Sequence, residues 1–299
     1  KKINISIPII YVDNPRKSLS EACSNFYKIK PKKLLAVTGT NGKTSVVNFF
    51  YQILNLINIP VATIGTLGIH SKKFKKKSDL TTADPLSLHK NLQMLAKKKI
   101  NNVILEASSH GLQQNRLDNL KFKIGIFTNL SQDHLDYHKN MKNYFNAKMY
   151  LFKSILTRNS TIITDKNNIQ LNKIKKIASY RKLRLNMIHS NNGIEILNHF
   201  YLENNQFIKI NYKKKIYEIK IPLIGYLQIK NLLMSILAAL NIGIKINKII
   251  NIISKIQPVP GRLEYIGKQK NNSKIILDYA HTPDALDKTL KTLKEHFKK

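Results

Sequence analysis

The chain has 299 residues, enough for one large domain or two ordinary ones with packed cores, and its single cysteine excludes an internal disulfide. Lys and Arg number 51 against 17 Asp and Glu, which gives a formal net charge of +34. Only six of the basic residues are Arg, and the lysines are spread along the whole chain, so a compositional bias explains the charge better than a dedicated nucleic-acid surface.

Polar residues interrupt every long apolar stretch of the sequence. The longest candidate span, 221–244, is broken in this way, so no transmembrane helix is predicted. The stretch behind Lys1 and Lys2 lacks the uninterrupted apolar core and the cleavage site of a secretory signal. We therefore predict a cytoplasmic chain without membrane insertion, in which Cys23 is a buried or neutral thiol.

Strands and helices alternate over the first half of the chain. The apolar run at 32–38 predicts a strand, and apolar residues at helical spacing over 45–57 predict the helix that follows it. Later strands are predicted at 61–64, 102–107, 124–129 and 161–164. Later helices are predicted at 85–98 and 140–155. This alternation implies an α/β fold with a mostly parallel sheet covered by helices on both faces.

The pattern changes after residue 193. Period-two alternation over 193–221 predicts a set of antiparallel hairpins, and the Pro and Gly residues at 258–261 predict a linker. Helices are predicted at 227–241 and 246–255, followed after the linker by a strand at 274–277 and a helix at 283–297. This last pair would begin a second, Rossmann-like α/β domain. Because one strand and one helix cannot form a domain core, we expect the chain as given to be incomplete.

The turn between the first predicted strand and helix has the features of a phosphate-binding loop. Gly39 and Gly42 let successive backbone amides point at one anion, and the helix N-terminus adds partial positive charge. Lys43 can reach terminal phosphates, and the Thr44 hydroxyl can hold magnesium. Val37 stands where the usual eight-residue loop has glycine, so this is a shortened variant of a P-loop; an ordinary Gly-rich turn is the alternative.

One acidic residue and one cluster of His and Asp residues are found at the ends of later strands. Glu106 ends the strand at 102–107, at the edge where parallel sheets bind ligands, and it could hold magnesium or cap a neighbouring helix. Residues 129–138 contain two His and two Asp within six positions. That density indicates either a metal or proton-transfer site or a solvated helix N-terminus capped by Asp133.

Six separated stretches, in this order, resemble the Mur ligases, and most closely the branch that adds the third residue of the peptidoglycan stem. They are 38–44, 81–85, 106–112, 129–138, 260–264 and 278–283. Residues 13–27 are similar to the family's connection between its first and central domains. The resemblance implies a connection from a missing N-terminal domain at 1–30, a central ATP-binding domain at 31–257, and a linker with the start of a truncated C-terminal ligase domain at 258–299.

The resemblance also implies roles for individual residues. The ATP-binding set is Gly39, Thr40, Asn41, Gly42, Lys43, Thr44, Ser45, Asn231, Arg262, Asp278 and His281. The set that contacts the uridine-nucleotide muramoyl-dipeptide is Thr81, Thr82, Ser108, Gln114 and Arg116. The magnesium ligands, for two ions, are Thr44, Glu106, His134 and Lys148 as a carbamate. The catalytic residues are Lys43, Lys148 and His134. Gln228 replaces an asparagine that the family has near the adenine, which leaves its contact in doubt.

The implied chemistry is ATP-dependent amide formation. The substrate carboxylate attacks the γ-phosphate of ATP, and the incoming amine displaces phosphate from the resulting acyl phosphate. A carbamate on Lys148 needs the neutral amine, which is only ~0.04% populated at pH 7 for an unperturbed lysine pKa of ~10.4. Burial that lowers this pKa by ~3 units would raise that fraction to a few tenths.

Four functions remain open from the sequence. The first is a ligase that adds an amino acid, meso-diaminopimelate or lysine, to the muramoyl dipeptide without a nucleic-acid partner. The others are a folate-polyglutamating ligase, a basic P-loop nucleic-acid motor, and a fragment that binds ATP but is inactive through truncation. The sequence does not determine the oligomeric state, for which we take a monomer.

Overall fold

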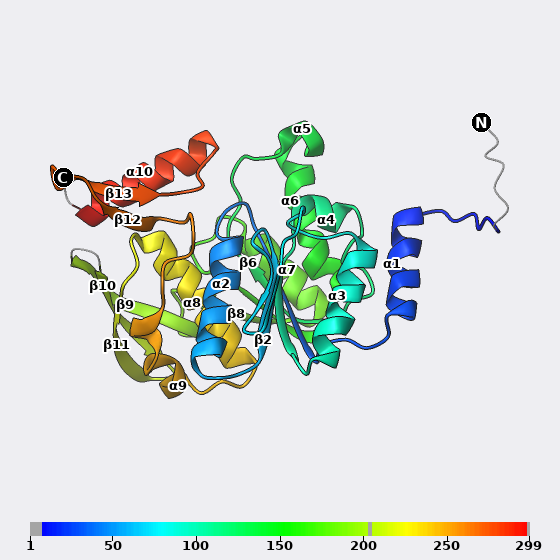
Figure 1. Cartoon of the computed structure of the whole chain (residues 1–299), viewed down its shortest axis with the longest axis horizontal. Helices are drawn as coiled ribbons and strands as arrows, with labels where there is room; N and C mark the ends of the chain where they lie inside the picture. Colours follow the sequence, from blue (N-terminus) through cyan, green and yellow to red (C-terminus); the bar gives the residue numbers. More distant parts are fainter. Residues whose placement is uncertain (1–7, 203–204, 298–299) are drawn as a thin grey trace.

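The computed structural model describes residues 8–202 and 205–297 (Figure 1). Within these residues the main sheet has eleven strands in the order β11-β10-β9-β8-β7-β6-β1-β5-β2-β3-β4. The strands from β2 to β9 along this order pair in parallel, and the neighbours at both edges pair antiparallel. Their bounds are β1 Lys33–Thr38, β2 Val61–Gly65, β3 Gly68–Ser71, β4 Phe74–Lys76, β5 Asn102–Glu106, β6 Phe122–Phe127, β7 Leu156–Asp165, β8 Arg184–Ile188, β9 Gly193–Leu202, β10 Asn205–Tyr212 and β11 Lys215–Ile221.

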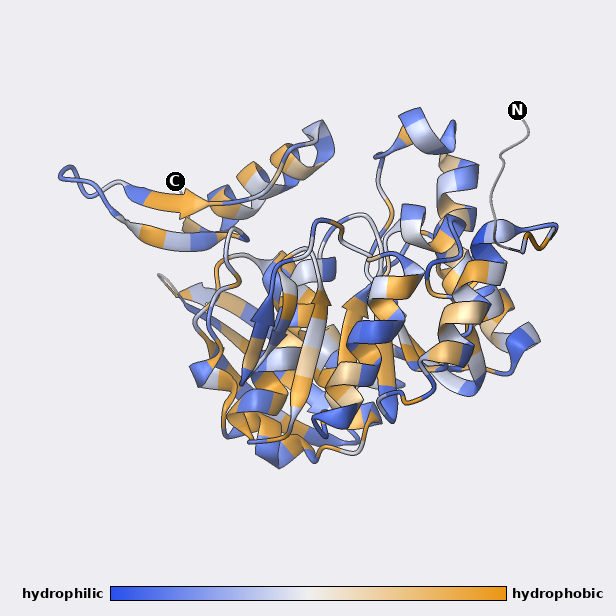
Figure 2. Ribbon diagram, turned by 45° about the vertical axis from the view of Figure 1, so that its right-hand side comes forward, coloured by the Kyte–Doolittle hydropathy of each residue, from blue (hydrophilic) through white to orange (hydrophobic). Residues whose placement is uncertain are grey.

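Helices cover both faces of this sheet, as predicted for the fold class. One face packs against α2 (Lys43–Leu56), α8 (Tyr226–Asn241) and α9 (Ile246–Ile250) through one apolar cluster. The opposite face packs through a second cluster against α3 (Pro85–Lys97), α4 (Ser109–Gln113), α6 (Met141–Tyr150) and α7 (Leu171–Arg181). Figure 2 shows that hydrophobic residues concentrate in the strands between these layers. The fold class predicted from the alternation is therefore confirmed.

The central strand β1 determines where a site can form. Five of its six residues are buried, and it pairs in parallel with β5 on one side and β6 on the other. Val37 lies opposite Glu106, and Thr38 lies opposite Phe127. The carboxyl ends of the three strands therefore meet at one edge, where chain connections leave in opposite directions, and this is where open α/β sheets bind ligands.

Several predicted elements differ from the structure. The helix predicted at 246–255 is wrong in its second half, because α9 ends at Ile250 and a 3₁₀ turn covers Ile253–Lys255. The helix predicted at 140–155 is α6 followed by a π-helical turn at Leu151–Ile155. Several short or polar elements were not predicted from the sequence: α1 (Pro15–Phe26), the β3–β4 hairpin, α4, α5 (Leu135–His138), α7 and β8.

The C-terminal unit contains one strand more than predicted. Strand β12 (Glu264–Lys268) pairs antiparallel with β13 (Lys274–Leu277), and α10 (Pro283–Phe297) follows. The expectation of a single strand was wrong because β12 has only two large apolar residues and lies directly behind the breaker cluster. Leu286 and Leu290 on α10 remain 51% and 57% exposed, so the described part of this unit buries little of its apolar face.

Helix α1 packs over α3 at the edge of the molecule. Asn14 caps it by accepting a hydrogen bond from the Lys17 amide, and Ser20 and Cys23 face inward. Burial raises the pKa of the Cys23 thiol, in agreement with the buried or neutral cysteine that was predicted.

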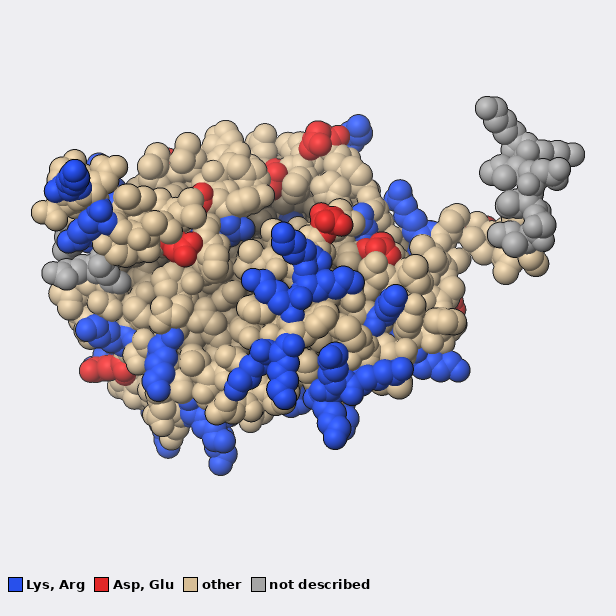
Figure 3. Space-filling model, viewed as in Figure 1, with Lys and Arg blue, Asp and Glu red and all other residues tan. Residues whose placement is uncertain are grey.

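The surface of the protein carries dispersed basic side chains, which Figure 3 shows scattered over much of one face. No helix within residues 8–202 and 205–297 combines the length and apolar character needed to span a bilayer.

His89 on α3 makes folding stability depend on pH. Its side chain is fully buried, and burial together with nearby Lys30 lowers its pKa to about 4. Between about pH 6.5 and 4 the unfolded state therefore binds more protons, so stability is lost as the pH falls through this window, by up to about 3 kcal/mol. We predict that His89→Leu makes the free energy of unfolding, measured with urea, depend less on pH over this range. The control His281→Gln, at an exposed site, should leave the pH dependence of this free energy unchanged.

Candidate functional site

The loop between β1 and α2 needs both of its glycines. Gly39 has φ +148° and Gly42 has φ +86°, backbone conformations that disfavour other residues. A Cβ at Gly39 would lie 1.9 Å from Thr128 Oγ1, and one at Gly42 would lie 2.5 Å from Asn231 Oδ1. The loop is held from outside by Asn129, whose backbone and side-chain oxygens each accept a 3.0 Å hydrogen bond from a loop amide.

Lys43 folds back over the loop. Its Nζ donates hydrogen bonds to the carbonyls of Gly39 at 3.0 Å and Thr40 at 2.8 Å. Burial lowers its pKa, an effect that the nearby carboxylates of Glu106 and Asp133 oppose. The ammonium group therefore lies over the backbone that would surround a bound phosphate.

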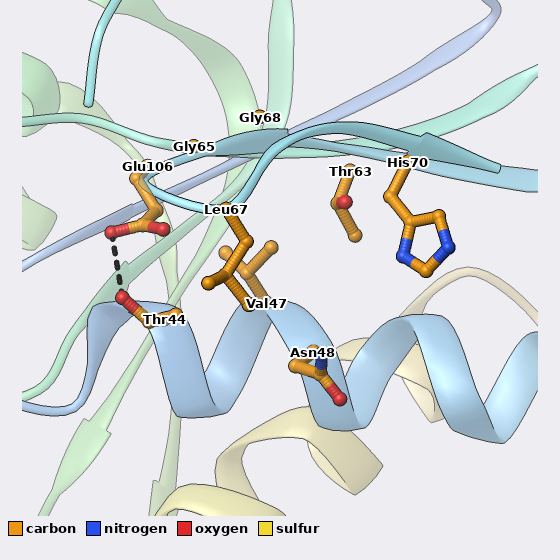
Figure 4. A pocket seen from close by; sticks show the side chains of 9 residues that line it. All are labelled: Thr44, Val47, Asn48, Thr63, Gly65, Leu67, Gly68, His70 and Glu106. Atoms are coloured by element: carbon orange, nitrogen blue, oxygen red, sulfur yellow. Dashed lines mark hydrogen bonds between the residues drawn. The ribbon is translucent and has the colours of Figure 1, made fainter. Parts of the chain in front are cut away.

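Glu106 joins the first turn of α2 to the β2–β3 connection. Its side chain is buried; Oε2 accepts hydrogen bonds from Thr44 Oγ1 at 3.1 Å and Thr66 Oγ1 at 3.2 Å, and Oε1 accepts one from the Thr66 amide at 2.9 Å. Figure 4 shows the Thr44–Glu106 pair beside a small pocket. Glu106 bonds α2 through the Thr44 hydroxyl and not through the first amides of the helix, so it does not cap those amides.

Hard oxygen donors make this pair suitable for a magnesium ion. Mg²⁺ binds proteins through one or two carboxylates and completes its shell with substrate phosphates and water. Among the described residues, no three His, Cys, Asp or Glu side chains converge on one metal position. A metal at Thr44 and Glu106 would accordingly depend on the phosphates of a bound nucleotide.

Lys148 is fully buried on α6 and points at the loop. Its Nζ donates to the Gly39 carbonyl at 2.8 Å and lies 4.2 Å from the centre of the Tyr144 ring. Burial and, next, the charge of Lys43 hold its pKa well below the usual value. Tyr144 is also tied to the loop, because its hydroxyl lies 3.2 Å from Thr40 Oγ1.

An aromatic and imidazole cluster surrounds this lysine. His134 is exposed at the start of α5 with φ +53°, and its ring lies 4.8 Å from His110 and 6.1 Å from Tyr144. Asp133 accepts a hydrogen bond from the amide of His134 and so does not cap α5 through that helix's own amides. His138 is buried against Ser109, and burial lowers its pKa to about 4. His138 belongs to the 129–138 cluster that the sequence marked, whereas Tyr144 was missed as a site residue; its spacing, four positions before Lys148 on a predicted helix, was the available signal.

The predicted substrate residues form a connected strip beside Glu106. Thr82 Oγ1 donates to the Glu106 carbonyl at 2.8 Å and accepts from the Ser108 amide at 2.9 Å. Arg116 Nη1 donates to the Thr82 carbonyl at 2.6 Å, and its Nε donates to Gln114 Oε1 at 3.0 Å. The last member is Thr81, whose hydroxyl lies 3.1 Å from that of Thr66.

The C-terminal unit approaches the loop from the side of α8. Asn231 packs against Gly42, and Gln228 donates from Nε2 to the Arg262 carbonyl at 3.1 Å, so the Gln228 amide is engaged within the protein. The Arg262 guanidinium lies 4.3 Å from the Tyr279 ring centre. Asp278 accepts from the Leu263 amide at 2.8 Å. His281 is exposed, with Nδ1 2.9 Å from the Tyr279 carbonyl.

Family models match two stretches of the chain. The Mur ligase middle domain matches residues 37–239, and the Mur ligase glutamate ligase domain matches residues 261–299. The UDP-N-acetylmuramoyl-L-alanyl-D-glutamate--2,6-diaminopimelate ligase of Rickettsia bellii is 38% identical over 98% of this chain and 62% of its own length. The protein of the same name from Chelativorans sp. is 35% identical over 97% of this chain and 60% of its own length. The chain thus spans about three fifths of these relatives.

The chain is also similar in fold to solved structures. A structure of a UDP-N-acetylmuramoyl-L-alanyl-D-glutamate--2,6-diaminopimelate ligase superposes with a TM-score of 0.79 and 28% identity, covering 94% of this chain and 57% of that one. The apo form of L. casei FPGS superposes with a TM-score of 0.76 at 15% identity, over 97% of this chain and 78% of that one. The second likeness bears on the fold alone.

The contact between Gly42 and Asn231 can be tested by stability. We predict that Gly42→Ala costs about 1–3 kcal/mol in the free energy of unfolding, because it adds a left-handed Ala and a steric clash. In an Asn231→Ala background the clash is removed and only the backbone part, about 1–2 kcal/mol, remains. Urea unfolding of the four proteins measures both terms; equal costs in the two backgrounds would contradict the packing described here.

Proposed function

Because this chain belongs to the Mur ligase family, we propose that it carries the ATP site and the reaction centre of a ligase that acts on UDP-N-acetylmuramoyl-L-alanyl-D-glutamate. The amino acid added is 2,6-diaminopimelate, which the names of similar curated relatives contain. The observation that carries the proposal is the convergence of Lys43, Glu106 and Lys148 on the phosphate loop.

The loop and Lys43 would bind the phosphates of ATP. The amides from Gly39 to Ser45 and the N-terminus of α2 offer donors and partial positive charge to an anion. Lys43 now donates to two loop carbonyls, and a bound phosphate would offer it a charged acceptor in their place. Asn231, Arg262, Asp278 and His281 lie on α8 and in the C-terminal unit, where we place the nucleoside end of ATP.

Thr44 and Glu106 would hold the first of two magnesium ions. When bound, magnesium neutralises phosphate charge and so lowers the repulsion that an approaching carboxylate meets. The second ion would be held by His134 and by Lys148 after modification. The His134 side chain is 44% exposed and its Nε2 lies 3.4 Å from Asp133 Oδ2, so an ion bound there would replace this contact.

Lys148 is suited to carry a carbamate. Its buried amine has a strongly lowered pKa, which populates the neutral form that reacts with carbon dioxide. The amine lone pair forms the N–C bond, one N–H proton passes to water, and the side chain ends as an anionic carboxylate. Carbamate formation converts Lys148 from a group that repels Lys43 when protonated into an anion that attracts it.

The reaction then runs in two displacements. An oxygen of the substrate carboxylate attacks the γ-phosphorus while the bond to the β-phosphate oxygen breaks, giving an acyl phosphate and ADP. The neutral amine of the amino acid attacks the acyl carbon, phosphate leaves, and the amine proton passes to a base. Lys43 stabilises the negative charge on the transferring group. The strip of Thr81, Thr82, Ser108, Gln114 and Arg116 would hold the muramoyl dipeptide beside it.

We further propose how the chain divides and where it acts. Residues 31–257 form the ATP-binding domain, residues 1–30 connect it to an N-terminal domain, and residues 258–299 begin the C-terminal ligase domain. The protein acts in the cytoplasm, where its nucleotide substrates are, as a monomer and without a nucleic-acid partner. The apolar face left open on α10 supports the last boundary, because a complete domain would bury it.

Acceptor profiling tests the proposed reaction. We expect a protein containing this chain to release phosphate from ATP only when UDP-N-acetylmuramoyl-L-alanyl-D-glutamate and diaminopimelate are both present. Lys43→Met should lower the rate of phosphate release by about 10- to 100-fold, the loss expected for a charge-assisted contact. It should lower the affinity of the 299-residue chain for ADP by about the same factor.

Lys153→Met, at an exposed lysine on the turn after α6, is the matched control and should change neither quantity. If lysine is the preferred acceptor, the proposed amino acid is wrong but the proposed reaction stands. Release driven by a folate and glutamate would replace the proposed reaction, and DNA-stimulated hydrolysis would point to a motor. ADP binding without any acceptor-dependent release would identify the chain as a nucleotide-binding fragment.

The carbamate has a direct spectroscopic test. We predict that protein equilibrated with ¹³C-labelled bicarbonate gains one slowly exchanging carbamate signal by ¹³C NMR, which Lys148→Gln loses and Lys153→Gln keeps. The signal should weaken as the pH falls, because protonated amine cannot form the N–C bond. An unchanged signal in Lys148→Gln would place any carbamate elsewhere.

A further inference from the structure

A second buried charge cluster lies outside the site described above. Asp165 ends β7, and its buried carboxylate accepts hydrogen bonds from His189 Nδ1 at 2.8 Å and Lys230 Nζ at 2.7 Å. The other ring nitrogen of His189 lies 2.6 Å from the Tyr226 hydroxyl. His189 follows β8 with φ +56°, a conformation that the surrounding contacts must maintain. The cluster therefore joins the ends of two strands to the beginning of α8.

The cluster supplies what the beginning of α8 lacks. Gly225 caps this helix without a side-chain hydrogen bond, and its first turn has no acidic residue. Asp165 provides a carboxylate from another element at this end of the helix, where negative charge is favourable. Its hydrogen bonds to His189 and Lys230 outweigh burial and lower its pKa to about 2, so it stays ionised. Removing this charge would leave the partly buried Lys230 without its carboxylate partner.

Helix α8 also abuts the phosphate loop directly behind Lys230. Asn231, the next residue, leaves no space for a Cβ at Gly42, and Ser235 one turn later donates from Oγ to the Val46 carbonyl at 2.9 Å. The two helices α2 and α8 share the apolar cluster on this face of the sheet. A displacement of the first turns of α8 would therefore be transmitted to the loop through close-packed contacts.

The same turn of α8 meets the C-terminal unit. The Gly225 amide donates to His296 Nδ1 at 3.3 Å, and Gln228 donates to the Arg262 carbonyl. The beginning of α8 is thus in contact with the sheet, the loop and the C-terminal unit within two helical turns.

We propose that Asp165, acting through His189 and Lys230, is a positioning residue that sets α8 against the phosphate loop and thereby determines nucleotide affinity. The proposal rests on the proposed function in one respect, that the loop binds ATP. Asp165 touches neither the loop nor any residue assigned to magnesium, so its effect on the nucleotide passes through the placement of Asn231 and Gly42.

Asp165→Asn in the 299-residue chain tests this inference. The substitution keeps the shape of the side chain and removes its charge. We expect ADP affinity, measured by calorimetry with magnesium at a temperature where both proteins are folded, to fall about 10-fold. Hydrogen–deuterium exchange should become faster at the amides of 39–45 and 226–231.

Two further variants separate positioning from stability. Glu218→Gln breaks the exposed Lys209–Glu218 pair and should change neither affinity nor loop exchange. Asp165→Asn combined with Lys230→Met removes the unpaired cation, so it should regain thermal stability while the affinity stays reduced. Recovery of both quantities in the double variant would reduce the cluster to a stabilising role.

The proposal is overturned if folded Asp165→Asn binds ADP within twofold of the unsubstituted protein and its loop amides exchange at the same rate. If the unsubstituted protein binds no nucleotide, the proposed function fails instead. Loop exchange then decides the positioning role by itself, because it needs no ligand.

Discussion

Two lysines donate hydrogen bonds to one backbone carbonyl, that of Gly39, and this convergence of two amines beside the loop is the constraint on which the site depends. Lys148 is fully buried, and its pKa is lowered by burial and by the charge of Lys43. Such an arrangement is costly unless anions complete it. Phosphates bound to the loop, and a carboxylate formed on Lys148 itself, would each supply negative charge where the fold provides little.

The fold brings these groups together by strand order. Because β1 pairs in parallel with both β5 and β6, the loop after β1, Glu106 after β5 and residues 128–134 after β6 leave the sheet at one edge. Helix α6 then returns along the sheet and places Tyr144 and Lys148 against the loop. The proposed magnesium ligand Glu106 and the positioning residue Asp165 are both the last residues of parallel strands, β5 and β7.

Whether a feature of the fold or site could be predicted from the sequence depends on how far apart in the chain its contacting residues lie. The loop around Lys43 and the strand that ends in Glu106 are each a single continuous segment of the sequence. Glycine spacing therefore predicted the loop, and apolar periodicity predicted the strand. Lys148 is one lysine among many and was found only through the family resemblance, since its burial against Gly39 depends on residues 109 positions apart. Asp165 and Lys230 could not be paired beforehand, because nothing local marks either as buried. Strand β12 was missed because its pairing with β13, not its own pattern, makes it a strand.

The C-terminal unit, formed by β12, β13 and α10, depends on contacts with α8 for its placement. Its helix α10 leaves Leu286 and Leu290 about half exposed, so apolar burial within the described unit contributes little to its placement. At the beginning of α8, Gly225 donates to His296 and Gln228 donates to Arg262, and the buried side chains of Leu263 and Thr292 pack beside Gly225. Since Arg262 belongs to the proposed nucleotide site, the position of α8 bears on both sides of the nucleotide: on the loop through Asn231, and on Arg262 through Gln228.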